Sequence, residues 1–232
     1  MSIFNPWLTA TFGLLVVWLL IFIFKSGVRK EMFWISLFTM PFGLTEPLFV
    51  PEYWNPPSLF DLASKIGFDI ESLIFSFAIG GIGAVLYETL STVKHQKMSM
   101  HEKHRKRHKF HLLTLISPII IFILLLPIKI NPIYSASIAM FVGGIAAILC
   151  RPDLKRKVWI GGITFFAIYF LLFILFNLVY PGLVLKIWNL SIISGILIIG
   201  VPLEELMFAF TFGMLWSSVY EHLLWYKVVK AQ

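Results

Sequence analysis

Seven stretches of mostly apolar residues run through the chain, and each is close to the roughly 20 residues that a helix needs to cross a bilayer. Charged residues make up only 13% of the 232 residues, whereas soluble domains carry about 25%. No part of the sequence is typical of a soluble domain. We therefore predict an all-α, polytopic membrane bundle of about seven transmembrane helices, at Trp7–Phe24, Met32–Val50, Ile70–Ser91, Phe110–Pro127, Ile133–Cys150, Val158–Tyr180 and Pro202–Trp225.

The basic residues are distributed unevenly over the loops between these segments. Sixteen of the nineteen Lys and Arg residues fall on one side, and the other side holds Lys65, Lys129 and Lys186. Because cytoplasmic loops carry the excess of positive charge, we predict an integral cell-membrane protein with its N-terminus outside and its C-terminus in the cytoplasm. No positive residue precedes the first apolar run, which is typical of an anchor and not of a cleaved signal. The net charge of +7 is then a topology signal, and no nucleic-acid partner is expected.

The third and seventh segments resemble each other. Aligned without gaps, Ile70–Glu88 and Leu203–Glu221 are identical at seven of nineteen positions. The shared positions include glutamates, a glycine and a tyrosine, which a common hydrophobic bias does not explain. Such self-similarity is typical of duplicated structural units.

Two shorter pairs of matching dipeptides extend this repeat. Trp54-Asn55 corresponds to Trp188-Asn189, and Asn5-Pro6 to Asn131-Pro132. We predict two parallel three-helix repeats, residues 1–109 with a basic cytoplasmic loop and residues 131–232, joined by a connector helix at residues 110–130. In that arrangement the third and seventh helices are equivalent, and a site between them would use both.

Acidic residues inside membrane spans are candidate functional groups, because burying their charge is costly. Glu71, Glu204 and Glu205 lie in the first turns of the two duplicated helices, and Glu46 lies near the outer end of the second span. A carboxylate after Pro202 also complements the helix dipole, so an ordinary role at a helix start stays open.

Other notable residues are interpreted as structural. Glu88 and Glu221 adjoin basic loops and are expected to be ion-paired anchors. The small residues of Ser76-Gly80-Ala84 and Ala139-Gly143-Ala147 have the spacing that lets helices approach closely.

Carboxyl groups in an apolar, aromatic-rich interior can support acid/base chemistry. Desolvation and mutual repulsion keep one of them protonated, and such an acid can protonate an alkene. Aromatic faces stabilise the resulting cation, and a neighbouring carboxylate then removes a different proton. The result is an isomerisation that needs no redox cofactor.

The segment Trp188–Phe208, with Pro202-Leu-Glu204-Glu205, resembles the signature of the small membrane lycopene cyclases. These comprise the heterodimeric type of Gram-positive bacteria, the fused type of archaea and, as a relative, the cyclase half of fungal bifunctional phytoene synthase/lycopene cyclase. The two units, connector and length resemble the fused form. In the first unit, Asp69-Ile70-Glu71-Ser72 stands where Pro-x-Glu-Glu is expected, so only Glu71 carries over there.

The resemblance implies an intramolecular lyase or isomerase of the lycopene β-cyclase type. Its substrate would be an acyclic carotenoid in the bilayer, surrounded by membrane lipids, and no flavin, nicotinamide or other cofactor is expected. The oligomeric state stays open. The resemblance implies that Glu204 and Glu205 form the acid/base pair and that Glu71 is their counterpart in the first unit. The substrate-binding residues are predicted to be Trp54, Phe75, Phe77, Trp188, Phe208 and Phe210.

Five histidines lie in or just after the basic segment Lys94–Lys109: His95, His101, His104, His108 and His111. Their spacing fits one helical face and would permit a metal site, but the segment offers no thiol ligand. A solvated basic loop beside anionic headgroups is the favoured interpretation. With Cys150 as the sole cysteine, we predict no disulfide and no metal site.

Three other classes of function compete. A retinal protein needs a lysine in the middle of a span, and the predicted spans contain none. A transporter with parallel repeats would have polar, discontinuous helices at mid-membrane, whereas these segments are apolar. A non-catalytic carotenoid- or lipid-binding protein would keep the aromatic pocket, and only an activity measurement separates it from a cyclase.

Overall fold

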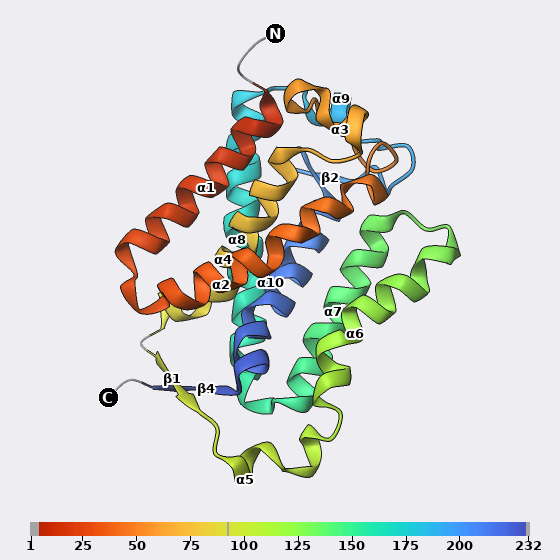
Figure 1. Ribbon diagram of the computed structural model, residues 1–232. Coiled ribbons are helices and arrows are strands. Elements are labelled where there is room, and N and C mark those ends of the chain that lie inside the picture. The colour runs from red at the N-terminus through yellow and green to blue at the C-terminus, as the bar shows by residue number, and fades with distance from the viewer. Residues whose placement is uncertain (1–4, 92, 231–232) are drawn as a thin grey trace.

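The computed structural model describes residues 5–91 and 93–230, and these form a mainly helical bundle (Figure 1). Within these residues, five helices are long and apolar enough to cross a membrane. The fold therefore fits a membrane protein, and the count of seven spans stays a prediction. The longer helices are α1 (Pro6–Phe24), α2 (Arg29–Thr39), α4 (Ile70–Leu90), α6 (His111–Leu125), α7 (Pro132–Cys150), α8 (Lys155–Val179) and α10 (Leu203–Leu224).

The second predicted span is not one continuous α-helix. α2 ends at Thr39, and a 3₁₀ helix, η2 (Met40–Leu48), continues from it. Pro41 and Pro47 explain the change, because proline cannot donate an i→i−4 hydrogen bond and its ring crowds the preceding turn. Close packing adds to this, since a Cβ on Gly43 would lie 2.6 Å from the Ser72 carbonyl oxygen of α4.

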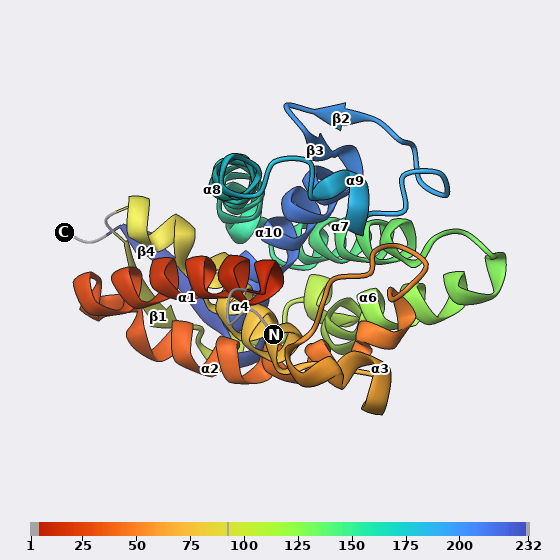
Figure 2. The same cartoon turned by 90° about the horizontal axis from the view of Figure 1, so that it is seen from above.

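Two central helices, α4 and α10, hold the bundle together. α4 packs against α1, α2, α8 and α10, while α10 also packs against α7 and α8. Seen from above, α1, α2 and α4 lie together beside the group of α7, α8 and α10, and α6 packs against α7 (Figure 2). Each group corresponds to one predicted three-helix unit, although the division into repeats stays a prediction.

The predicted small-residue positions do allow close helix contacts. A Cβ on Gly80 of α4 would lie 1.9 Å from Thr39 Oγ1, and one on Gly143 of α7 would lie 2.4 Å from Pro118 Cγ. Since neither position leaves room for a side chain, glycine sets how closely α4 approaches α2 and α7 approaches α6.

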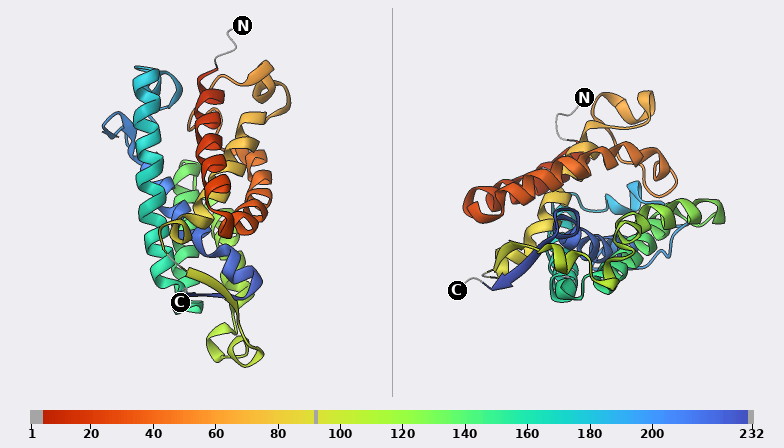
Figure 3. Two further views of the ribbon diagram at one scale, coloured as in Figure 1. Left: turned by 90° about the vertical axis from the view of Figure 1, so that its left-hand side faces the viewer. Right: turned by 60° about the horizontal axis from the view of Figure 1, so that its bottom comes forward.

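Short strands depart from the all-α expectation. β1 (Val93–Lys97) pairs antiparallel with β4 (Tyr226–Lys230), and β2 (Leu197–Ile198) pairs with β3 (Val201–Pro202). β1, β4 and α5 (Met100–Lys103) lie at one end of the bundle, and the short helices α3 (Leu62–Ile66) and α9 (Val184–Ile187) lie at the other (Figures 1 and 3). The end that holds β1, α5 and β4 carries the predicted cytoplasmic loops.

The histidine-rich segment is not one helix, so the alternative of a single histidine face is not observed. It forms β1, α5 and a 3₁₀ turn, η4 (Lys106–His108), before α6 begins. His101 and His104 are exposed, whereas His108 and His111 are buried. The four remaining 3₁₀ turns in the described residues are η1 (Ser26–Val28), η3 (Leu59–Asp61), η5 (Leu126–Ile128) and η6 (Pro152–Leu154), the last of which leads into α8.

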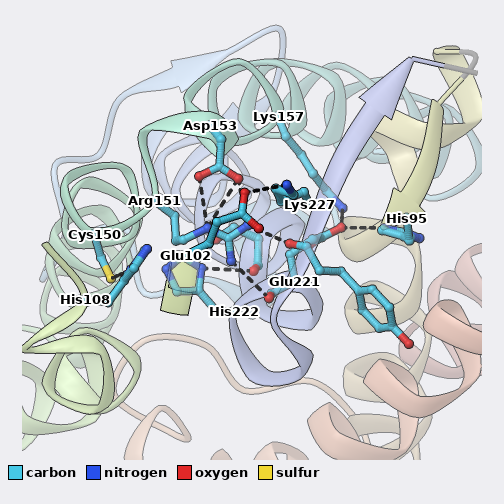
Figure 4. Close-up of polar contacts among 12 residues, drawn as sticks. His95, Glu102, His108, Cys150, Arg151, Asp153, Lys157, Glu221, His222 and Lys227 are labelled. Atoms are coloured by element: carbon cyan, nitrogen blue, oxygen red, sulfur yellow. Dashed lines mark hydrogen bonds and ion pairs between the residues drawn. The ribbon is translucent and has the colours of Figure 1, made fainter. Parts of the chain in front are cut away.

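A buried polar cluster joins the two units near the β1–β4 end. Lys157 Nζ lies 3.2 Å from Glu31 Oε1 and 2.5 Å from Glu88 Oε1, and it also contacts Glu221. His95 Nε2 lies 2.7 Å from Glu221 Oε1 (Figure 4). The expectation that Glu88 and Glu221 are ion-paired is confirmed. Lys157, expected in a loop, instead lies inside α8 and is 2% exposed.

Candidate active site

A cavity of about 870 Å³ lies between the two helix groups. Its size is within the range of small-molecule sites. Acidic side chains reach it at two positions, Glu46 and Glu205. The rest of the lining is mainly apolar, and its aromatic members are Trp7, Phe38, Phe42, Phe49, Tyr53, Trp54, Phe75, Phe122, Tyr169, Phe173, Phe176, Tyr180, Trp188, Phe208, Phe212 and Trp216.

Glu205 is the most extensively hydrogen-bonded acid of this cavity. Its Oε1 accepts hydrogen bonds from Tyr53 Oη at 2.7 Å and from Trp188 Nε1 at 3.0 Å. Its Oε2 accepts one from Tyr169 Oη at 2.7 Å. These donors come from three separate parts of the chain, and all four side chains are buried. Three donors directed at one carboxyl stabilise the negative charge that forms when its proton leaves.

Glu204 points elsewhere. Consecutive residues of an α-helix are about 100° apart, so Glu204 and Glu205 cannot share one direction. Glu204 Oε1 accepts hydrogen bonds from Tyr134 Oη at 2.5 Å and from the Ser194 backbone N–H at 2.9 Å. It is buried, but it does not belong to the cavity lining.

Glu71, the repeat partner of Glu204, has a similar structural environment. Its Oε1 accepts hydrogen bonds from Asn5 Nδ2 at 3.0 Å and from the Leu59 backbone N–H at 2.8 Å. In the described part of the chain it forms no hydrogen bond with Glu204 or Glu205, and it does not line the cavity. The expected meeting of these three carboxyl groups is therefore not observed in the hydrogen bonds of the structure.

Glu46 is the second acid of the cavity. It lies on η2, is 6% exposed, and its Oε2 accepts a hydrogen bond from the Asp69 backbone N–H at 2.7 Å. Its Oε1 is buried without a hydrogen-bond partner. Asp69 in turn caps α4 by accepting from the Ser72 backbone N–H at 2.6 Å. Ser72, which aligns with Glu205 in the repeat, lines the same cavity as Glu46.

The two tryptophans predicted to bind substrate lie together. An isolated β-bridge joins Trp54 to Trp188, and their rings are 5.3 Å apart. Asn189 N–H donates to the Tyr53 carbonyl at 3.0 Å, and Asn55 N–H donates to the Ile187 carbonyl at 2.8 Å. The duplicated Trp-Asn pairs therefore meet at one edge of the cavity.

The four predicted phenylalanines separate into two pairs. Phe75 and Phe208 line the cavity, whereas Phe77 and Phe210 do not. Phe77 packs against Trp18, with ring centroids 5.1 Å apart, and Phe210 packs against Trp159 at 6.2 Å. Residues two apart in a helix point to opposite sides, which explains why each helix offers one phenylalanine to the cavity.

Tyr53 and Tyr169 were not predicted from the sequence. Tyr53 lies in a loop next to the duplicated Trp54, and Tyr169 is a polar-tipped residue in the middle of α8. A buried tyrosine hydroxyl usually has a hydrogen-bond partner. The position of Tyr169 within an apolar span was therefore the sequence signal that could have indicated a polar site. Nothing in the sequence identified Glu205 as that partner.

The fold and this cavity define a helical membrane protein with carboxyl groups on the wall of an apolar, aromatic pocket. Residues 131–223 match the family model described as lycopene cyclase. The chain is therefore similar to the lycopene cyclase family over its second predicted unit. The matched region contains Glu204, Glu205, Tyr169 and Trp188. No curated protein and no solved structure matches the chain.

Proposed function

We propose that the chain closes the acyclic end group of a lycopene-type carotenoid by acid/base chemistry within the membrane. The observation that carries this proposal is Glu205, a buried carboxyl that accepts three hydrogen bonds on the wall of an apolar cavity. The family match supports the substrate class. The reaction is an isomerisation, because it conserves the atoms and the oxidation level of the substrate.

In the proposed reaction, Glu205 donates its carboxyl proton to the terminal double bond of the substrate. The resulting cation is attacked by an inner double bond, which forms the carbon–carbon bond of the ring. A carboxylate then removes a ring proton, and a β-type ring results. Tyr53, Tyr169 and Trp188 stabilise the Glu205 carboxylate as it loses its proton, while aromatic faces stabilise the cation and exclude water.

Glu46 supplies the second carboxyl in this proposal. In the predicted repeat, Ser72 occupies the position of Glu205, so the first unit lacks that acid on α4. Glu46 instead reaches the cavity from η2, next to the start of α4. This correspondence depends on the predicted repeat, which two pairs of residues support. Asn5 and Asn131 each cap a helix ahead of a proline, and Trp54 and Trp188 are joined by a β-bridge.

Glu71 and Glu204 act as positioning residues in the same proposal. Glu71 links α4 to the start of α1 and to the loop at Leu59, and Glu204 links α10 to α7 and to the loop at Ser194. Both therefore fix loops that follow the cavity-lining residues Trp54 and Trp188 in sequence. Within the membrane, these loops face the outside if the basic end lies in the cytoplasm.

Glu46→Gln should lower cyclisation by at least about tenfold, because glutamine cannot accept or donate a proton in the reaction. Glu52→Gln is the matched control, since Glu52 is a nearby exposed glutamate. The measurement is the amount of cyclised carotenoid per amount of protein in membranes. Equal activity in the Glu46 variant and the control would remove Glu46 from the mechanism.

The proposed function is tested by expressing the chain in cells that accumulate lycopene. Chromatography of the pigments should reveal β-carotene or the singly cyclised γ-carotene. Purified protein that retains unchanged lycopene, in cells without any cyclised product, would instead indicate a carotenoid-binding protein without catalysis.

A further inference from the structure

Three potential metal ligands from two regions of the chain lie together in a buried cluster. His108 ends η4, His111 begins α6, and Cys150 ends α7. Cys150 Sγ lies 3.5 Å from His108 Nδ1 and 3.5 Å from His111 Nδ1. The three side chains are 6%, 9% and 4% exposed, respectively. Figure 4 shows His108 directed at Cys150.

The spacing of these atoms matches a tetrahedral zinc site. Zinc binds cysteine sulfur at about 2.3 Å and histidine nitrogen at about 2.0–2.1 Å, so tetrahedral angles place sulfur and nitrogen ligands about 3.5 Å apart. Both observed sulfur–nitrogen distances have this value. The three ligand atoms all lie within 4.8 Å of one another. Little movement would therefore be needed to bind an ion.

The hydrogen bonds around His111 set the tautomer that metal binding requires. His111 Nε2 lies 3.1 Å from the His222 carbonyl oxygen, which can only accept, so the ring proton is on Nε2. The lone pair of the neutral ring is then on Nδ1, which faces Cys150. Metal-binding histidines commonly donate their second ring N–H to a backbone carbonyl in this way.

The buried arginine next to the cluster is ion-paired. Arg151, which follows Cys150 and is fully buried, donates to Asp153 from Nε at 3.0 Å and from Nη2 at 2.7 Å. A guanidinium would repel a metal ion, and the Asp153 carboxylate offsets this repulsion. His108 Nε2 is buried without a hydrogen-bond partner, which leaves this histidine with no other polar role in the described structure.

We propose that His108, His111 and Cys150 bind one zinc-type divalent cation, with water as the fourth ligand. The ion would connect the segment before α6 to the end of α7. This site lies apart from Glu205 and its hydrogen-bond partners, and it serves the stability of the bundle. The proposal does not depend on the reaction that the chain catalyses.

Metal content and cobalt spectroscopy test this site. The protein is purified in detergent with an affinity tag that contains no histidine. The parent should hold about one zinc per chain. Cobalt substituted for zinc should give the near-ultraviolet absorption band of a cobalt–thiolate bond. Cys150→Ser should abolish this band and lower the Co²⁺ affinity by at least about tenfold.

His104→Ala is the matched control, because His104 is an exposed histidine of the same segment. This variant should keep the parent's zinc content and cobalt spectrum. The cobalt spectrum of the parent needs no variant, so the test holds even if Cys150→Ser fails to fold. A parent without a thiolate band, or a folded Cys150→Ser variant that keeps its zinc, would overturn the proposal.

Discussion

Replacing Glu205 with glutamine should lower the rate of cyclisation by about 10²–10⁴-fold, the range expected for losing a general acid or base. Glutamine has nearly the same shape, so the donors Tyr53, Tyr169 and Trp188 can remain close to the side chain. The variant should therefore fold and bind substrate while losing the proton that starts the reaction. Product formation is measured in membranes that contain equal amounts of each protein.

Glu204→Gln is the most informative comparison, because it changes the neighbouring carboxyl in the same helical turn. Glu204 contacts Tyr134 and Ser194 outside the cavity, so its loss should lower activity much less and leave the pH dependence of the parent unchanged. Should Glu204→Gln abolish cyclisation while Glu205→Gln leaves it intact, the two assignments must be exchanged.

The hydrogen-bond donors of Glu205 provide a graded test of the same mechanism. Tyr53→Phe and Tyr169→Phe each remove one hydroxyl that contacts this carboxyl at 2.7 Å. If those hydroxyls stabilise the carboxylate formed in the reaction, each variant should lose about tenfold or more in activity. The double variant should lose more than either single variant.

Lys157→Met should destabilise the protein by about 3–5 kcal/mol, the cost typical of leaving buried charges unpaired. Lys157 contacts Glu31, Glu88 and Glu221, and within the described residues the other basic side chain that contacts these carboxyl groups is His95. Methionine fills a similar volume without a charge, so the three carboxyl groups would repel one another. The measurement is thermal unfolding in detergent.

Lys155→Met is the control for this substitution, because Lys155 is exposed at the start of the same helix. It should change stability little. Adding Glu88→Gln and Glu221→Gln to the Lys157→Met chain should recover part of the lost stability, because fewer charges then remain unpaired. A Lys157→Met variant as stable as the control would mean that the cluster does not stabilise the bundle.

Another ion pair at the same end of the molecule is partly exposed. Lys227 Nζ lies 2.6 Å from Glu102 Oε1, and this contact lowers the pKa of Glu102 to about 2. The pair joins the basic loop to β4 on the surface, where solvent screens the interaction, so its contribution to stability is expected to be small. The buried Lys157 cluster is therefore the main electrostatic link between the elements at this end.

The sequence by itself predicted the long helices and three catalytic candidates, Glu71, Glu204 and Glu205. Apolar runs of bilayer length predicted the membrane helices, because lipid requires continuous apolar segments. The Pro202-x-Glu204-Glu205 motif identified the start of α10 as a candidate catalytic segment only through resemblance. The repeat identified Trp54 and Trp188 as equivalent positions. The break in the second span was readable from Pro41 and Pro47, whose local effect on a helix needs no tertiary contact.

Tertiary structure decided which of these side chains meet. Helical periodicity separates Glu204 from Glu205, but only the packing of α8 and the Tyr53 loop shows which one enters the cavity. Glu46, Tyr53 and Tyr169 surround the site from positions distant in sequence, as Cys150 joins His108 and His111. Local sequence fixes the direction of a side chain relative to its own helix; the partner that it faces depends on how the helices pack.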